Sequence, residues 1–170
     1  MKKMTFQLIS LFILLVFLQV GLFNHIHLFG FATPLLYIYF LIKLPINMNR
    51  NVMVLLGALL GFIIDIFSFT LGLCMTTLIV VSFLRYYLLK LFAPRDVFDE
   101  YLPSFSTFGT YFFMRYAAVV SLIHVFLLYT IESFSLFNPL TLFLRVAGSF
   151  TLTILLIFAF ESFNFDAFKR

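Results

Sequence analysis

The sequence predicts an all-α integral membrane protein, with about six transmembrane helices in a single domain that spans residues 1–170. Hydrophobic residues make up 64% of the chain and charged residues 11%, and the mean hydropathy is +1.14. Soluble domains carry roughly 25% charged and about 45–50% apolar residues. This chain therefore has too few polar side chains to cover itself, and we expect lipid to surround it.

The first two apolar runs differ in character. Residues 4–23 follow two lysines, a start that is also found in signal peptides. The run is longer than a signal-peptide core and no A-x-A-like cleavage site follows it, which favours an uncleaved helix. Residues 28–44 are predicted as the second span, although Gly30 and Pro34 interrupt the run.

The remaining apolar runs predict four further helices. Residues 52–92 are continuously apolar except around Thr70-Leu71-Gly72-Leu73, so two helices joined by a tight turn fit them best. The predicted spans are 52–71, 73–92, 108–131 and 139–160. Pro139 suits the first turn of the last helix, where no amide hydrogen bond is lost.

Basic residues predict the orientation. They flank every second connection and both ends of the chain: Lys2, Lys3, Lys43, Arg50, Lys90, Arg95, Lys169 and Arg170. The loops near 24–27, 70–73 and 132–138 hold no Lys or Arg. By the positive-inside rule both termini are cytoplasmic. The net charge of +4 is thus explained by topology, and nucleic acid is not an expected partner.

Ionisable side chains inside the spans are the first candidates for function, since each costs at least ~2.5–3.5 kcal/mol at membrane depth. Asp65 shares one helix face with Gly57, Gly61, Ser68 and Gly72. Glycines at this spacing allow a second helix to approach closely. We therefore expect Asp65 to point at a neighbouring helix.

The last span offers a partner for this carboxylate. Thr141, Arg145 and Gly148 form a small or polar stripe, and Arg145 lies at nearly the depth of Asp65. The hypothesis is an Asp65–Arg145 ion pair in the outer half of the membrane, because either charge alone is costly there. The pair would either lock two helices together or form part of a ligand cavity or partner surface.

Arg85 and Arg115 lie about seven residues from the cytoplasmic ends of their helices. Each is expected to extend toward lipid phosphates or to reach Glu161, Asp96 or Asp99.

Histidines give little indication of chemistry. His124 shares a face with Ala117 and Ser121, so it is interpreted as a buried histidine that a neighbouring helix satisfies. His25 and His27 lack a third ligand nearby and make a poor metal site. No catalytic motif or second intramembrane acid is found, so the sequence predicts neither an enzyme nor a metal or cofactor.

The connection 93–107 has two interpretations. Phe98, Tyr101 and Leu102 recur at helical spacing among acidic residues, as in a short interfacial helix. This loop is either a plain inner loop or a docking point for a cytoplasmic partner.

Several segments carry a family resemblance. The run Leu-Gly-Ala-Leu-Leu-Gly-Phe-Ile-Ile-Asp over 56–65, followed by Leu-Gly-Leu over 71–73, resembles the rod shape-determining protein MreD family, and so do the segments 18–30 and 34–36. The resemblance covers essentially the whole chain. Most members have an acidic residue after the proline, where this chain has Leu35.

The resemblance implies a non-catalytic scaffold of the bacterial cell-elongation machinery in the inner membrane. Such proteins bind MreC, and through the complex they connect MreB with RodA and a class B penicillin-binding protein during peptidoglycan synthesis. The family's fold is similar to the substrate-binding components of energy-coupling-factor transporters. A small-molecule-binding component of a vitamin-type transporter is the alternative.

Overall fold

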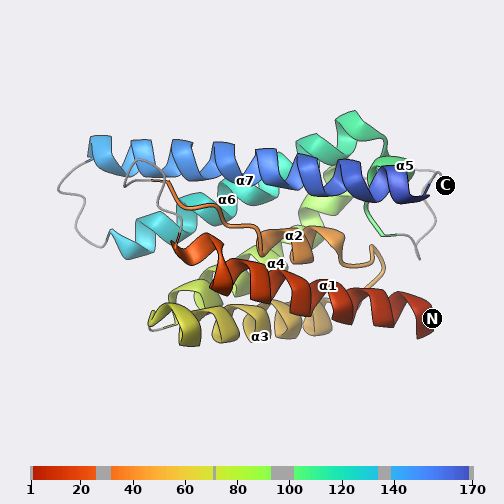
Figure 1. Ribbon diagram of the computed structural model, residues 1–170, viewed down its shortest axis with the longest axis horizontal. Coiled ribbons are helices and arrows are strands. Elements are labelled where there is room, and N and C mark those ends of the chain that lie inside the picture. Colours follow the sequence, from red (N-terminus) through yellow and green to blue (C-terminus); the bar gives the residue numbers. More distant parts are fainter. Residues whose placement is uncertain (1, 26–31, 71, 93–101, 134–138, 169–170) are drawn as a thin grey trace.

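The protein is an elongated bundle of helices in the computed structural model (Figure 1), which describes residues 2–25, 32–70, 72–92, 102–133 and 139–168. No β-strand occurs in these ranges. The helices are α1 (Lys2–Gly21), the 3-10 helix η1 (Phe23–His25), α2 (Ile38–Lys43), α3 (Arg50–Ser68), α4 (Leu73–Phe92), α5 (Phe105–Phe108), α6 (Thr110–Glu132) and α7 (Pro139–Phe168).

Four of the described helices, α3, α4, α6 and α7, are long and apolar enough to cross a membrane. Helix α1 adds a shorter apolar stretch, Thr5–Gly21. Large apolar side chains on the outside of the bundle, such as Phe6 on α1 and Leu55 on α3, are well exposed. The chain is therefore an all-α, multi-pass membrane protein, as its composition predicted.

The α3–α4 hairpin has the tight turn that the sequence predicted. Phe69 ends α3 in the left-handed conformation with φ 54°, and Gly72 has φ 75°. A Cβ atom on Gly61 would lie 2.5 Å from the Cα of Met75, and one on Gly57 would lie 2.1 Å from the Oγ of Ser82. The two glycines therefore let α3 and α4 pack with their backbones close together.

The prediction of a continuous second helix over 28–44 was wrong. Only Ile38–Lys43 form α2, and residues 32–36 are non-helical but largely buried. Polar side chains of α1 and α7 hydrogen-bond this stretch of backbone. Gln19 accepts from the amide of Leu36 at 2.9 Å, and its own amide donates to the carbonyl of Pro34 at 3.0 Å. Non-helical backbone at membrane depth is tolerated only where protein surrounds and satisfies it.

Two side chains of α7 accept further hydrogen bonds from the backbone of residues 32–36. The amide of Thr33 donates to the Oγ of Ser149 at 3.0 Å, and the amide of Leu35 donates to the Oγ1 of Thr153 at 3.1 Å. As Figure 1 shows, α2 consequently lies in the interior, between α1 and α7.

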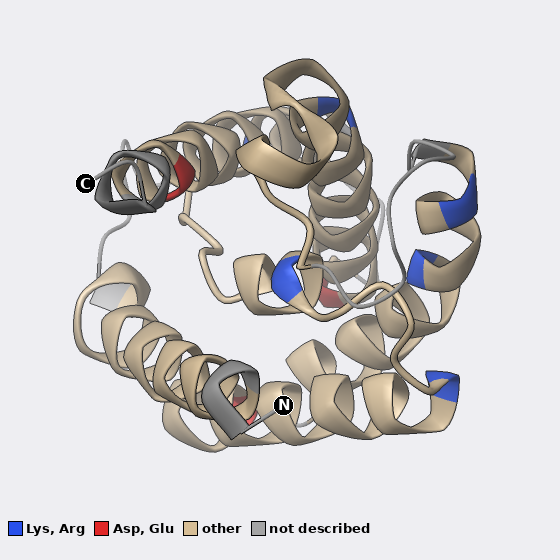
Figure 2. Ribbon diagram, turned by 90° about the vertical axis from the view of Figure 1, so that its right-hand side faces the viewer, with Lys and Arg blue, Asp and Glu red and all other residues tan. Residues whose placement is uncertain are grey.

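Both termini lie at the same end of the bundle (Figure 1). Figure 2 looks onto this end, where lysine and arginine residues are spread over several helices. We call it the basic end, defined by Lys43, Arg50 and Lys90. Helix α7 begins at Pro139, as predicted, and continues to Phe168, beyond the predicted end.

Candidate functional site

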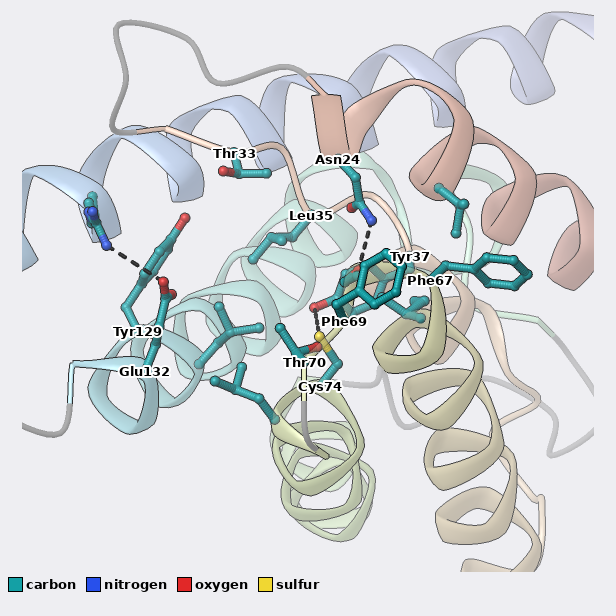
Figure 3. Close-up of a pocket in the computed structure, with 16 residues that line it drawn as sticks. Asn24, Thr33, Leu35, Tyr37, Phe67, Phe69, Thr70, Cys74, Tyr129 and Glu132 are labelled. Atoms are coloured by element: carbon teal, nitrogen blue, oxygen red, sulfur yellow. Dashed lines mark hydrogen bonds and ion pairs between the residues drawn. The ribbon is translucent and has the colours of Figure 1, made fainter.

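A cavity of about 690 Å³ lies at the end of the bundle opposite the basic end. Five parts of the chain surround it: the end of α1 with η1, the segment 32–37, the α3–α4 turn, the end of α6 and the start of α7 (Figure 3). The polar residues in its lining are Asn24, Thr33, Tyr37, Ser68, Thr70, Cys74, Tyr129, Glu132 and Arg145. Its size and its mixture of apolar and polar groups are typical of small-molecule sites.

Asp65 does not form the predicted ion pair with Arg145. Its carboxylate is 4% exposed and binds the start of α4. Oδ1 accepts from the amide of Cys74 at 2.9 Å and from the Thr70 hydroxyl at 2.5 Å, and Oδ2 accepts from the amide of Met75 at 2.8 Å. The first amides of a helix have no partner within it and attract negative charge, so Asp65 caps α4.

The turn explains why this contact forms. Gly61 brings the start of α4 against α3, and Asp65 lies one helical turn further along the same face. The carboxylate therefore points at a neighbouring helix, as its spacing predicted, but it meets backbone amides. Ser68, on the same face, accepts a hydrogen bond at 2.8 Å from the side-chain amide of Asn24 at the cavity wall.

Arg145 pairs with Glu132. Its Nη1 lies 3.6 Å from Oε1 of Glu132, and the two side chains are 36% and 46% exposed. In Figure 3 Glu132 lies beside Tyr129, across the cavity from Asn24 and Tyr37. An exposed pair of this kind contributes at most about 1 kcal/mol to stability. Both charges therefore remain accessible to a molecule that enters the cavity.

Gly148 has a packing role on α7. A Cβ there would lie 2.9 Å from the Cβ of Ala32, so the missing side chain makes room for the segment 32–37.

A chain of three side chains links the cavity to the core. The Tyr37 hydroxyl donates to the Sγ of Cys74 at 3.7 Å, and Nε2 of His124 lies 2.8 Å from the same hydroxyl. His124 is fully buried, as predicted, but only its Nε2 has a partner, while Nδ1 is buried without one among the described residues. The Cys74 thiol contacts a phenol rather than the imidazole, so the cavity presents no cysteine–histidine pair.

Arg85 is fully buried, so the expectation that it extends to lipid phosphates or reaches Glu161 was wrong. Its guanidinium donates to the carbonyl of Leu44, and a weaker contact of 3.4 Å reaches the carbonyl of Ile42. These carbonyls lie at the C-terminal end of α2, where a helix leaves acceptors unpaired and favours a cation. Arg85 therefore fixes the buried short helix in place.

Glu161 holds three elements together near the basic end. It is 2% exposed. It accepts hydrogen bonds from the Tyr39 hydroxyl at 2.5 Å, from Nζ of Lys43 at 2.8 Å and from the amide of Phe105 at 3.1 Å. A buried carboxylate needs this many partners to offset the loss of water.

Arg115 is exposed, and its Nη1 donates to the Tyr111 hydroxyl at 3.2 Å. The predicted interfacial helix, with Phe98 and Tyr101, lies outside the described residues. Leu102 is described and is half-buried.

The sequence analysis did not identify Gln19, Ser149 and Thr153, which satisfy buried backbone, or the contacts that Tyr37, Lys43 and Glu161 make. The glutamine inside the first apolar run could have indicated such a contact, because a buried side-chain amide needs hydrogen-bond partners. Comparison of the chain with models of protein families, with curated proteins and with solved structures found no match.

Proposed function

We propose that this chain is a non-catalytic membrane scaffold of the bacterial cell-elongation machinery, that it lies in the inner membrane with cytoplasmic termini, and that it binds MreC. One observation carries the proposal. Residues 56–65, which carry the main part of the family resemblance, belong to a closely packed hairpin in which Asp65 caps α4.

The other buried ionisable groups support the same conclusion. Arg85 is bound to backbone carbonyls, and Glu161 is bound to Lys43, Tyr39 and Phe105. Each of these groups stabilises the contact between helices. Buried charges that are used to hold helices together suit a protein that presents a fixed surface to partners.

Purification of the tagged full chain in mild detergent, followed by mass spectrometry of co-purifying proteins, tests the proposal. We expect MreC, accompanied by MreB, RodA or the class B penicillin-binding protein. The variant Phe98→Ala/Tyr101→Ala tests the loop 93–107 as the docking point, and Phe163→Ala removes an aromatic ring that is 79% exposed on α7 as the matched control. Failure to recover MreC from a monodisperse preparation would contradict the scaffold function.

The cavity favours a second candidate, the small-molecule-binding component of a vitamin-type transporter. Its volume fits a small molecule, and Glu132 and Arg145 offer both charges to a polar or zwitterionic ligand. Recovery of paired ATPases and a transmembrane coupling subunit in the same purification would support this candidate over the scaffold.

A further inference from the structure

Two cations at the basic end lie on aromatic rings where α3 begins and α4 ends. The guanidinium carbon of Arg50 is 3.6 Å from the ring centroid of Phe83 and 5.4 Å from that of Tyr87. Nζ of Lys90 is 4.5 Å from the ring centroid of Tyr86. We call these five residues the aromatic–basic cluster. Lys90 also hydrogen-bonds the Tyr86 side chain, whereas the cation–π contacts of Arg50 do not use its N–H donors.

No acid neutralises the cluster within the described part of the chain. The ion pairs found there are Lys43–Glu161 and Arg145–Glu132, and neither includes Arg50 or Lys90. Nε and Nη2 of Arg50 are buried without a hydrogen-bond acceptor. Arg50 as a whole is half-buried and Lys90 is exposed, so both cations lack a counter-charge that a group from outside the chain can supply.

The cluster borders the apolar outer surface of the bundle. Phe83 and Tyr87 are 47% and 53% exposed, and Val80, one turn before Phe83 on the same face of α4, is 39% exposed. The end of an apolar spanning helix lies at the depth of lipid headgroups, where tyrosine and basic residues gather. An acceptor that reaches Arg50 from this side comes from the lipid.

We propose that the aromatic–basic cluster binds the phosphate of an anionic phospholipid from the leaflet at the basic end. The planar guanidinium of Arg50 and the ammonium of Lys90 supply the charge and the donors for phosphate oxygens. The acyl chains follow the exposed apolar face of α4 past Phe83 and Val80. This site requires no protein partner and is independent of the proposed scaffold function.

Native mass spectrometry of the detergent-purified full chain tests the proposal, with phosphatidylglycerol and phosphatidylcholine as probes. A basic residue near an anionic lipid surface contributes about 1 kcal/mol, so removing both charges predicts a roughly thirtyfold loss of phosphatidylglycerol affinity in Arg50→Gln/Lys90→Gln. Arg115→Gln is the matched control, because Arg115 is an exposed cation that lies over the single ring of Tyr111. We expect its affinity to stay near that of the wild type.

Three outcomes would overturn the proposal. The first is equal binding of the two lipids to the wild type, and the second is an equal loss in Arg115→Gln, which would show a general charge effect. In the third, millimolar inorganic phosphate displaces phosphatidylglycerol, which would show a site for free phosphate rather than lipid. The exposed single variant Lys90→Gln, with size-exclusion profiles of all variants, separates loss of the site from loss of the fold.

Discussion

Replacing Gly61 by alanine tests the packing of the α3–α4 hairpin most directly. The new Cβ would lie 2.5 Å from the Cα of Met75 and 2.8 Å from the carbonyl carbon of Cys74. These are backbone atoms, so no side-chain rotation relieves the clash. Ordinary contact begins at 3.4 Å, so α4 must withdraw by about 0.9 Å. The same movement would stretch the bonds from Asp65 to the first amides of α4 beyond hydrogen-bond range.

Two effects of Gly61→Ala lower the free energy of unfolding, and a third partly offsets them. Overpacking costs about 1–3 kcal/mol, and the weakened bonds to a charged acceptor cost about 1.5–3 kcal/mol each when lost. The higher helix propensity of alanine offsets only about 1 kcal/mol of this loss. We expect Gly61→Ala to lower the free energy of unfolding by about 3 kcal/mol or more, as the sum of these effects.

Unfolding by titration with sodium dodecyl sulfate, followed by circular dichroism in mixed micelles, measures this difference. Gly21→Ala is the control, because a Cβ there meets no atom within 4 Å. We expect the control to stay within ~0.5 kcal/mol of the wild type. If Gly61→Ala also stayed within that range, the close approach of α3 and α4 would be refuted.

Three further predictions concern buried polar groups; the first and third use the same unfolding assay and the second uses hydrogen exchange. Asp65→Asn keeps one acceptor oxygen but turns its NH2 group toward one of the capped α4 N–H groups. It should lower the free energy of unfolding by about 1–3 kcal/mol, and an unchanged unfolding midpoint would contradict the role of Asp65 as a cap. Gln19→Leu leaves the amide of Leu36 without its acceptor, and hydrogen exchange of the peptide around this amide should rise by at least tenfold for a loss of about 1.4 kcal/mol. Glu161→Gln leaves the Lys43 cation buried without a counter-charge and should cost about 3–5 kcal/mol. Lys43→Met/Glu161→Gln should recover part of that loss, and equal losses in both variants would show that charge is not the cause.

Hydropathy and spacing predicted those parts of the fold that depend on local sequence. The long helices follow from uninterrupted apolar runs, and the hairpin follows from glycines at 57 and 61 and the turn around Gly72. These features involve helices that follow one another in the sequence, so residues that are close together in the chain determine them. The direction of Asp65 could be predicted for the same reason.

Contacts between distant segments could not be predicted in this way. The run 28–44 is as apolar as a spanning helix, but apolarity does not distinguish burial in lipid from burial in protein. Its short helix depends on donors and acceptors such as Ser149 and Arg85, which lie far along the chain. The prediction of an Asp65–Arg145 ion pair was wrong because similar depth in the membrane does not show which groups lie close together. Backbone amides of α4 bind the carboxylate, and Glu132 is the partner of Arg145.

The dependence of the segment 32–37 on α7 also constrains the order of membrane insertion. The hydrogen bonds from Thr33 to Ser149 and from Leu35 to Thr153 join residues 116 and 118 positions apart. During synthesis this segment emerges long before its acceptors exist, and lipid cannot satisfy its open backbone. The insertion machinery or the water-facing interface must therefore hold the segment until the last helix arrives. A truncated chain that ends before α7 should consequently be a substrate for membrane quality-control proteases.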